Sequence, residues 1–326
     1  MEARLDRKIT LHMMGDWGTA NLHRICGWIG AELWRRSLPG SKFATWAARG
    51  GTDSIEAVLD GEVQIALFVP AGFARTVFER HAICTRPDTG RLRALGTLPQ
   101  DDRLVLAIDA KFGITRFADL RAKRPALRLT TGVDDGVNMT GFAAHRMLEA
   151  SGVPAKTIEN WGGKMLLGEA PWDTIPLVTR GDADAVMFEA VMTPFWKELC
   201  TRKQMHFLPF EDDALAAVER DFGWKRAMVP QDRFPGLAAP FQALDFSDFL
   251  LVCRDDLPDD IAYTIAAILC ETPGLLESQY RHMPPKDSPV TYPLDPKKIA
   301  ATSIPLMPGA ERYYRENGHL AGPPSH

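Results

Sequence analysis

Apolar and polar residues recur along the first eighty positions in the order strand, glycine-rich turn, helix. Residues 42–48 have the composition of a short strand, residues 50–54 form a turn, and residues 54–59 begin a helix. The same order occurs at residues 9–38 and again at residues 63–80. Such repeated units predict a parallel sheet covered by helices, in which ligands bind beyond the carboxyl ends of the strands.

The turn at residues 50–54 (Gly-Gly-Thr-Asp-Ser) is the first candidate binding element. Its glycines let a ligand approach the backbone, and the Thr-Asp-Ser run supplies N-cap side chains and free N–H groups that favour an anion. An ordinary strand-to-helix turn is equally compatible with these residues. A second turn of this kind, residues 132–140, separates a strand expected at 126–131 from a helix expected at 141–150.

The succession of elements predicts an α/β protein with two lobes, each a mainly parallel sheet flanked by helices. The expected boundaries are 1–104 with 246–326 for a discontinuous lobe 1 and 105–245 for lobe 2, with hinge strands near 103–110 and 246–254. Residues 205–210 are expected to be the last strand of lobe 2. The Pro/Gly-rich stretch 230–240 is expected to be irregular.

Composition and charge narrow the classes of function. The 326 residues are 45% apolar and 25% charged, with a net charge of -4. No basic patch predicts nucleic-acid binding, and the apolar runs are too short for membrane insertion. The charged first eleven residues contain no export signal, which predicts a cytoplasmic protein. Prior removal of a leader would instead make the protein periplasmic.

The sequence contains no motif for cofactor or metal chemistry. The five cysteines lack metal-ligand spacing, and there is no phosphate-binding loop, zinc-protease motif or serine-nucleophile motif. We therefore expect no cofactor and no metal. His23 and His145 are expected on helices, in structural roles.

Five segments, taken in order, resemble the TAXI family, the solute receptors of one class of TRAP transporters. They are Gly51-Thr52-Asp53-Ser54 with Gly61-Glu62, and residues 117–121, 181–188, 254–263 and 305–318. The last (PLMPGAERYYRENG) is the most specific, and the resemblance extends over nearly the whole chain. It implies a type II periplasmic-binding-protein-like fold that closes by hinge motion on a small-molecule ligand in the cleft between the lobes. It also implies a small carboxylate or an amino acid as the ligand, and TRAP membrane subunits as partners of an exported protein. Two candidate tryptophans, named below, extend the expected carboxylates to aromatic ones.

The candidate ligand-binding residues lie where this fold places loops at the strand ends. They are Trp17, Thr19, Asn21, Arg49, Gly51, Thr52, Ser54, Phe68, Asp135, Asn138, Thr140 and Trp161. Arg49 can make a bidentate pair with a carboxylate, and Trp17 with Trp161 can sandwich a ring; solvated and packing roles are equally compatible. Asp134 and Asp135 would repel a carboxylate unless they are protonated or paired.

An enzyme on the same fold is the alternative, such as a cytosolic, cofactor-independent decarboxylase of aromatic carboxylates. In such a lyase, Arg49 or Lys164 would orient the substrate carboxylate. One acid among Asp16, Asp134 and Glu189 would protonate the developing carbanion. The catalytic candidates are therefore Asp16, Asp134, Glu189 and Lys164.

Overall fold

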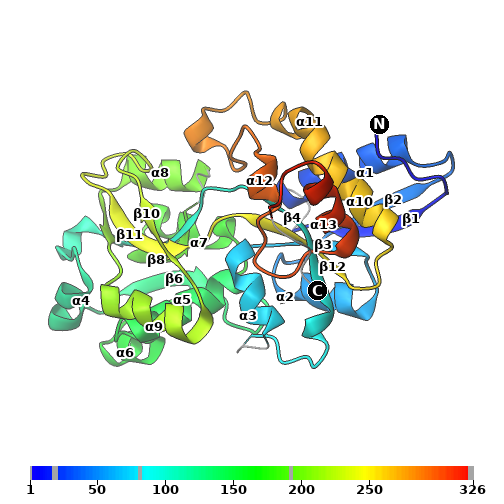
Figure 1. Cartoon of the computed structure of the whole chain (residues 1–326). Helices are drawn as coiled ribbons and strands as arrows, with labels where there is room; N and C mark the ends of the chain where they lie inside the picture. Colours follow the sequence, from blue (N-terminus) through cyan, green and yellow to red (C-terminus); the bar gives the residue numbers. More distant parts are fainter. Residues whose placement is uncertain (1, 17–20, 80–82, 191–193, 322–326) are drawn as a thin grey trace. The chain divides into compact units, whose positions relative to one another are not determined.

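The chain forms two compact α/β units (Figure 1). The structure is a computed structural model and describes residues 2–16, 21–79, 83–190 and 194–321. Unit 1 comprises Met1–Asp101 with Ser247–His326, and unit 2 comprises Asp102–Phe246. Among the described residues, no helix is both long enough and apolar enough to cross a bilayer.

Unit 1 is built on a five-stranded sheet with the strand order β2-β1-β3-β12-β4. Its strands are β1 (Thr10–Met14), β2 (Lys42–Trp46), β3 (Ile65–Phe68), β4 (Leu92–Leu98) and β12 (Phe249–Arg254). β1 pairs in parallel with β2 and β3, whereas β12 runs antiparallel between β3 and β4. The carboxyl ends of β1, β2, β3 and β4 therefore share one edge of this sheet.

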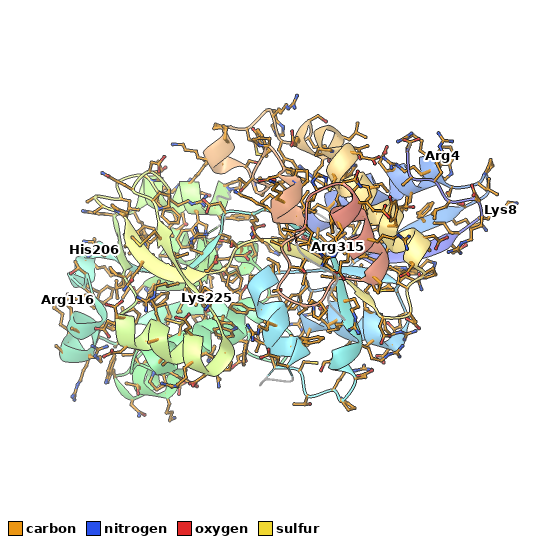
Figure 2. The ribbon with its side chains drawn as sticks, viewed as in Figure 1. Arg4, Lys8, Arg116, His206, Lys225 and Arg315 are labelled. Atoms are coloured by element: carbon orange, nitrogen blue, oxygen red, sulfur yellow. The ribbon has the colours of Figure 1, made fainter. Side chains whose placement is uncertain are left out.

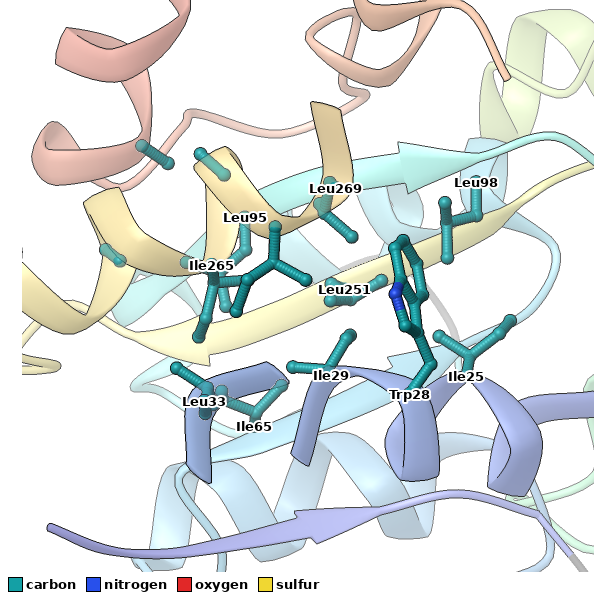
Figure 3. Close-up of a cluster of buried hydrophobic side chains, with 14 of the residues drawn as sticks. Ile25, Trp28, Ile29, Leu33, Ile65, Leu95, Leu98, Leu251, Ile265 and Leu269 are labelled. Carbon is teal, nitrogen blue, oxygen red and sulfur yellow. The ribbon is translucent and has the colours of Figure 1, made fainter. Parts of the chain in front are cut away.

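The helices of unit 1 pack on its sheet, and the longest of them, α1, buries one apolar face. The helices are α1 (Asn21–Arg36), α2 (Thr52–Asp60), α3 (Ala74–Phe78), α10 (Asp259–Glu271), α11 (Pro273–Glu277), α12 (Pro296–Ile299) and α13 (Pro308–Glu316). Ile25, Ile29 and Leu33 recur every four residues along α1, which places them on one face of the helix. All three are fully buried, in one cluster with Ile65 of β3 and Leu251 of β12 (Figure 3).

Unit 2 contains a seven-stranded sheet with the order β10-β11-β5-β8-β6-β7, and β9 also pairs with β5. Its strands are β5 (Arg103–Asp109), β6 (Arg128–Gly132), β7 (Lys164–Gly168), β8 (Ala185–Glu189), β9 (Met205–Leu208), β10 (Arg226–Val229) and β11 (Phe241–Asp245). β6 is parallel to β7 and β8, while β5 is antiparallel to β8, β9 and β11. The carboxyl ends of β6, β7 and β8 therefore share an edge.

Three strands of unit 2 depart from the sequence expectation. The three strands that the sequence did not predict are β7, β10 and β11. β10 and β11 follow β9 on either side of the irregular stretch 230–240, so the expectation that β9 is the last strand is wrong. β7 and β10 are short, partly exposed strands at the two ends of the sheet. The helices of unit 2 are α4 (Phe117–Lys123), α5 (Met139–Ala150), α6 (Ala155–Asn160), α7 (Pro171–Arg180), α8 (Pro194–Arg202) and α9 (Asp212–Phe222).

The two units repeat one topology. β1, α1, β2, α2 and β3 of unit 1 correspond in chain order to β6, α5, β7, α7 and β8 of unit 2, where α6 is an additional helix between α5 and β7, and the strand orders β2-β1-β3 and β7-β6-β8 match. Even a side-chain contact recurs: the His12 N–H donates to Gln64 Oε1 (2.8 Å), and the Arg128 N–H donates to Asp184 Oδ2 (3.2 Å). Elements at equivalent positions can therefore be compared between the units.

Long cationic side chains lie on the outside of each unit, as Arg4 and Lys8 do in unit 1 and Arg116 and Lys225 do in unit 2 (Figure 2). Arg116 pairs with Asp119 at 3.0 Å on the same helical turn. Exposed pairs of this kind contribute about 0–1 kcal/mol each, so the apolar clusters provide most of the stability.

A tight contact in unit 1 gives the first prediction. A Cβ atom on Gly96 of β4 would lie 2.7 Å from Leu269 Cδ1 and 2.7 Å from Tyr314 Oη, and that hydroxyl donates to the Leu95 carbonyl. Gly96→Ala is expected to lower the free energy of unfolding by about 1–3 kcal/mol, because side chains must move to admit the methyl group. Chemical denaturation measures this change. Gly90→Ala, where a Cβ meets nothing within 4 Å, is the control and should change stability little.

Candidate functional site

The structure places most candidate residues at the carboxyl edges of the two sheets. In unit 1 these are Asp16, Asn21, Arg49, Gly51, Thr52 and Ser54, and in unit 2 they are Asp134, Asp135, Asn138, Thr140 and Glu189. Trp17 and Thr19 lie outside the described residues. Phe68 ends β3 and is fully buried, so it is a core residue here.

Trp161 and Lys164 lie at the opposite edge of the unit 2 sheet, so the expectation that they join Asp134 is wrong. Lys164 opens β7 and is paired with Arg128 at the start of β6, whereas Asp134 follows the end of β6. Trp161 caps the carboxyl end of α6, just before β7. The misplacement follows from missing β7, since an extra strand carries the chain from one edge to the other.

In the turn at residues 50–54, the carboxylate of Asp53 is hydrogen-bonded to backbone N–H groups of the same stretch of chain. Gly50 has φ = +81°, a conformation that favours glycine. Asp53 Oδ2 accepts from the Arg49 N–H (2.6 Å), and Asp53 Oδ1 accepts from the N–H groups of Gly51 (3.0 Å) and Ser54 (2.9 Å). Asp53 therefore engages two N–H groups of the turn itself, those of Gly51 and Ser54, which leaves this turn a weaker anion site than its sequence suggests.

Asp16 and His23 form a polar pair at the carboxyl edge of unit 1. Asp16 follows β1, its side chain is 3% exposed, and its Oδ1 lies 3.4 Å from His23 Nδ1. Burial raises the pKa of Asp16 above its usual range, against the opposing effects of His23 and of the Leu22 N–H. Asp16 is therefore a carboxyl group that holds its proton more tightly than an exposed aspartate.

A tyrosine completes the polar surroundings of this pair. Tyr280 Oη donates to Asn21 Oδ1 at 3.1 Å, and the Arg24 guanidinium lies 5.7 Å from the centre of the Tyr280 ring. Burial raises the pKa of Tyr280 to about 12, so the phenol stays neutral near pH 7. The candidate Asn21 is thus held in place by an interaction with a residue far along the chain.

In unit 2, the turn between β6 and α5 is held by its own polar side chains. Asn138 is the N-cap of α5: its Oδ1 accepts from the Gly141 N–H (2.9 Å) and its Nδ2 donates to the Glu169 carbonyl (2.9 Å). Asp135 Oδ1 accepts from the N–H groups of Val137 (3.0 Å) and Asn138 (3.2 Å). Asn138 and Asp135 are therefore structural groups that shape the turn.

The two acids of this turn are both engaged. Asp134 Oδ2 lies 3.2 Å from Arg146 Nη2 of α5, which compensates its charge, and Asp135 accepts two backbone N–H groups. The repulsion expected between Asp134, Asp135 and a carboxylate is reduced by these partners. Arg146 was not among the candidates, and its position two turns into α5 gives no sequence signal that it reaches back to Asp134.

The first turn of α5 still presents donors. The Met139 and Thr140 N–H groups have no acceptor within the helix, as expected for its first positions, and no described residue accepts from them. The side chain of Thr140 adds a hydroxyl, and the residue is 9% exposed. Together with the helix dipole, these donors favour an anion.

The remaining candidate of unit 2, Glu189, ends β8 at the same edge. Glu189 is paired with Leu104 of β5 in the sheet, and the Glu189 carbonyl accepts from the Trp196 indole N–H at 2.8 Å.

Sequence reasoning missed His23 as a partner of Asp16, because the seven-residue separation has meaning only once β1 and α1 are placed. The spacing of residues in the sequence therefore did not predict the contact between Asp16 and His23.

Comparisons with known proteins agree with this architecture. The sequence profile of the NMT1-like family matches residues 27–318. The structure of PhnD1 from Prochlorococcus marinus in complex with methylphosphonate is similar, with a TM-score of 0.55, 11% identity, and coverage of 95% of this chain and 99% of that chain. MatC from Rhodopseudomonas palustris with bound malate has a TM-score of 0.49 and 12% identity, covering 95% of this chain and 97% of that chain. A search of curated proteins found no match.

At 11% identity, the likeness to PhnD1 establishes the fold and nothing about the ligand. The chain therefore has the two-lobed α/β architecture of periplasmic-binding-protein-like folds. The matched span, residues 27–318, covers all of unit 2 and most of unit 1, and it contains every described candidate except Asp16 and Asn21.

Proposed function

The chain belongs to the NMT1-like family, and from this we propose that it is a solute-binding protein whose ligand is a small carboxylate, aromatic carboxylates included. The first turn of α5 carries the proposal, because Met139 and Thr140 offer two N–H groups and a hydroxyl that no described residue uses. A carboxylate has two oxygens to accept from such donors. PhnD1, of similar fold, holds another small anion, methylphosphonate.

The engaged acids support the same ligand class. The charge of Asp134 is compensated by Arg146 at 3.2 Å, and the Asp53 carboxylate accepts hydrogen bonds from the backbone N–H groups of Arg49 and Gly51. Each unit therefore offers a strand-end loop whose carboxylates are already satisfied. In unit 1, Arg49 precedes the turn at residues 50–54, and a guanidinium can bind a carboxylate in a bidentate pair.

The finer proposal is a receptor of the TAXI type, working with TRAP membrane subunits when it is exported. Its most specific motif, residues 305–318, forms α13, where Tyr314 Oη donates to the Leu95 carbonyl at 2.7 Å and Tyr313 Oη to Glu271 at 3.2 Å. This motif therefore supports a shared way of building unit 1 and not a shared ligand. Fractionation of native cells, with determination of the amino terminus, distinguishes a periplasmic receptor from a cytoplasmic binding protein.

A decarboxylase is the second candidate function, and the raised pKa of buried Asp16 favours it. A carboxyl group whose pKa is raised holds its proton to a higher pH than an exposed aspartate, and such a group is a candidate proton donor to a developing carbanion. Lys164 lies at the wrong edge of its sheet to orient the substrate, which leaves Arg49 for that role. Stoichiometric retention of aromatic carboxylates without CO2 release would exclude this activity.

Ligand binding is tested on the full chain with acetate, succinate, glutamate, benzoate and phthalate, by native mass spectrometry and isothermal titration calorimetry. At least one carboxylate should bind stoichiometrically. Thr140→Val should weaken its binding roughly tenfold, because the isosteric change removes a hydrogen bond to a charged group. Thr157→Val, on α6 of the same unit, is the matched control. Failure of every carboxylate to bind, or equal affinity for wild type and Thr140→Val, would contradict the proposal or its site.

A further inference from the structure

Strand β2 forms one outer edge of the unit 1 sheet. In the order β2-β1-β3-β12-β4, the neighbour of β2 in the sheet is β1. The register between the two strands runs without a bulge from Lys42 to Trp46, and the strand contains no proline. Trp46 is 51% exposed, and Lys42 and Thr45 are exposed as well. A regular, exposed edge of this kind is a template for pairing with another strand.

The backbone groups on the outer side of β2 belong to Phe43 and Thr45. The Lys42 N–H and the Trp46 carbonyl bond to backbone groups at the two ends of β1, at 2.9 and 3.0 Å. Because these directions alternate along a strand, Phe43 and Thr45 direct their N–H and carbonyl groups away from β1. In the part of the chain that the structure describes, no group bonds to them.

The order of side chains along β2 is complementary to itself in the antiparallel direction. When Ala44 lies opposite Ala44 of a second copy, Lys42 of each copy lies opposite Trp46 of the other, and Phe43 lies opposite Thr45. Phe43 and Thr45 then form the hydrogen-bonded pairs, and Ala44, with its small side chain, takes the closer position between them. An ammonium group over an indole ring is a favourable cation–π contact.

Helix α1 adds an apolar side chain beside this edge. α1 packs next to β2 (Figure 1), and a Cβ atom on Gly30 would lie 3.6 Å from Phe43 Cβ. Trp34 lies one turn further along α1 on the same side and is 63% exposed. A two-fold axis through the paired Ala44 residues, perpendicular to the sheet, brings the second α1 to the same face, so both Trp34 side chains lie on that face.

The equivalent edge strand of unit 2 lacks this complementarity. β7 also lies at the end of its sheet, and it begins with Lys164 and ends with Gly168. An antiparallel copy of β7 would place Lys164 opposite Gly168, which offers the cation no ring. Pairing of β2 with β7 of another molecule would be heterologous, and would continue as a ring or filament.

We propose that two copies of this chain form a homodimer by antiparallel pairing of β2 about a two-fold axis at Ala44. The two unit 1 sheets then become one continuous sheet, with Lys42 of each copy against Trp46 of the other. The contact uses residues of unit 1 alone, so it goes beyond the proposed ligand binding and does not depend on it. The donors of α5 belong to unit 2 and are not part of the contact.

Sedimentation velocity of the full chain over a dilution series measures the association. Wild type should sediment as a dimer that dissociates on dilution. Thr45→Pro removes an outward N–H and spares the inward bonds to β1, so it should be monomeric at every concentration. Leu167→Pro is the matched control and should dimerise like wild type. Leu167 pairs with Thr131 of β6 as Thr45 pairs with Met13 of β1.

Ala44→Cys tests the register of the pairing. The Cα atoms of a close, non-hydrogen-bonded pair lie about 4.5 Å apart, which is within the range of a disulfide. Ala44→Cys should therefore form a disulfide-linked dimer with oxidised glutathione, which is reduced as the two thiols are oxidised. Thr45→Cys, which lies opposite Phe43, and wild type with its native cysteines are the controls and should stay unlinked.

Substitutions of Lys42 test the contact with Trp46. Lys42→Arg should keep the dimer, because a guanidinium also stacks on an indole ring. Lys42→Glu should weaken dimerisation roughly tenfold or more, because both cation–π contacts of the dimer are lost. Equal dimerisation of Lys42→Glu and wild type would contradict the proposed register.

The remaining outcomes decide the inference as a whole. Wild type that stays monomeric at every concentration would overturn it, and so would a dimer that persists in Thr45→Pro. Loss of the dimer in folded Leu167→Pro would show that β7 takes part, which also overturns it. Melting curves report whether each variant is folded. If either proline variant is unfolded, cross-linking decides: linkage of Ala44→Cys alone supports the pairing, and its absence overturns it.

Discussion

Gly141→Ala is expected to lower the free energy of unfolding by about 3 kcal/mol or more and to abolish carboxylate binding. A Cβ atom on Gly141 would fall inside van der Waals contact with the Val133 carbonyl and would lie 2.8 Å from the carbonyl carbon of Gly132. These obstacles are backbone atoms, which cannot rotate away as side chains do. The start of α5 would have to separate from the end of β6.

The same contact explains the expected loss of function. A Cβ on Gly132 would in turn lie 2.6 Å from the Gly141 nitrogen, so the two glycines let strand and helix backbones touch. This contact sets the direction of the Met139 and Thr140 N–H groups. A shift of about 1 Å at these donors breaks hydrogen bonds that tolerate only a few tenths of an ångström.

Denaturant unfolding and calorimetric titration measure the two effects of Gly141→Ala. Gly27→Ala is the matched control, since Gly27 also lies within a helix, is exposed, and has nothing within 4 Å of an added Cβ. It should raise stability by about 0.5–1 kcal/mol, because alanine is the better helix former. Wild-type stability and affinity in Gly141→Ala would show that the contact between β6 and α5 is not needed.

The regular elements that form the cores were predictable because their signal is local. The strand-turn-helix unit expected at residues 9–38 contains the helix α1 (Asn21–Arg36), and the strand expected at 126–131 is β6 (Arg128–Gly132). β7 and β10 gave no comparable signal, since a partly exposed strand at the end of a sheet lacks a clear alternation of apolar and polar residues.

The candidate site was predictable only as far as topology was known. Asp53 binds the N–H groups of its own turn and Asp134 pairs with Arg146, and neither contact follows from composition or spacing. Trp161 and Lys164 were misplaced for a different reason, because a missed strand reverses the edge to which its flanking residues belong. Side-chain pairing and strand count therefore limit site prediction more than motif recognition does.

The repeated topology also changes which turns are equivalent. The turn at residues 132–140 follows β6, whose counterpart in unit 1 is β1 and not β2. Its equivalent is therefore the segment that contains Asp16 and leads into α1, rather than the turn at residues 50–54. In each unit, the junction of the first parallel strand with its helix combines an aspartate with a basic side chain: Asp16 with His23, and Asp134 with Arg146.

The second large effect is expected from Asp102, the first residue of unit 2. Its side chain is fully buried, and Oδ1 accepts from the N–H groups of Arg103 (2.7 Å) and Ala190 (2.8 Å). Burial raises the pKa of Asp102 to about 7, although these hydrogen bonds and the nearby Arg233 favour the charged form. Folding therefore favours the protonated acid.

The sign of the pH dependence follows from this shift. The folded pKa of about 7 lies above the value of 3.8 for an exposed aspartate, so the stabilisation by protonated Asp102 is fully present below about pH 4. This stabilisation decreases as the pH rises from about 4 to about 7. Above about pH 7, Asp102 no longer contributes to the pH dependence of stability. A shift of about three units corresponds to about 4 kcal/mol at 1.4 kcal/mol per unit.

Asp102→Asn isolates this contribution, because asparagine keeps the Oδ1 acceptor and cannot ionise. Wild type should lose stability relative to Asp102→Asn between about pH 4 and pH 7. Asp184 is the matched control of opposite sign: Arg128 and Lys111 lower its pKa, so the stability lost in Asp184→Asn should be constant over that range and shrink only below it. A difference between wild type and Asp102→Asn that does not change with pH would show that Asp102 is ionised in the folded protein throughout, with its charge compensated inside unit 2.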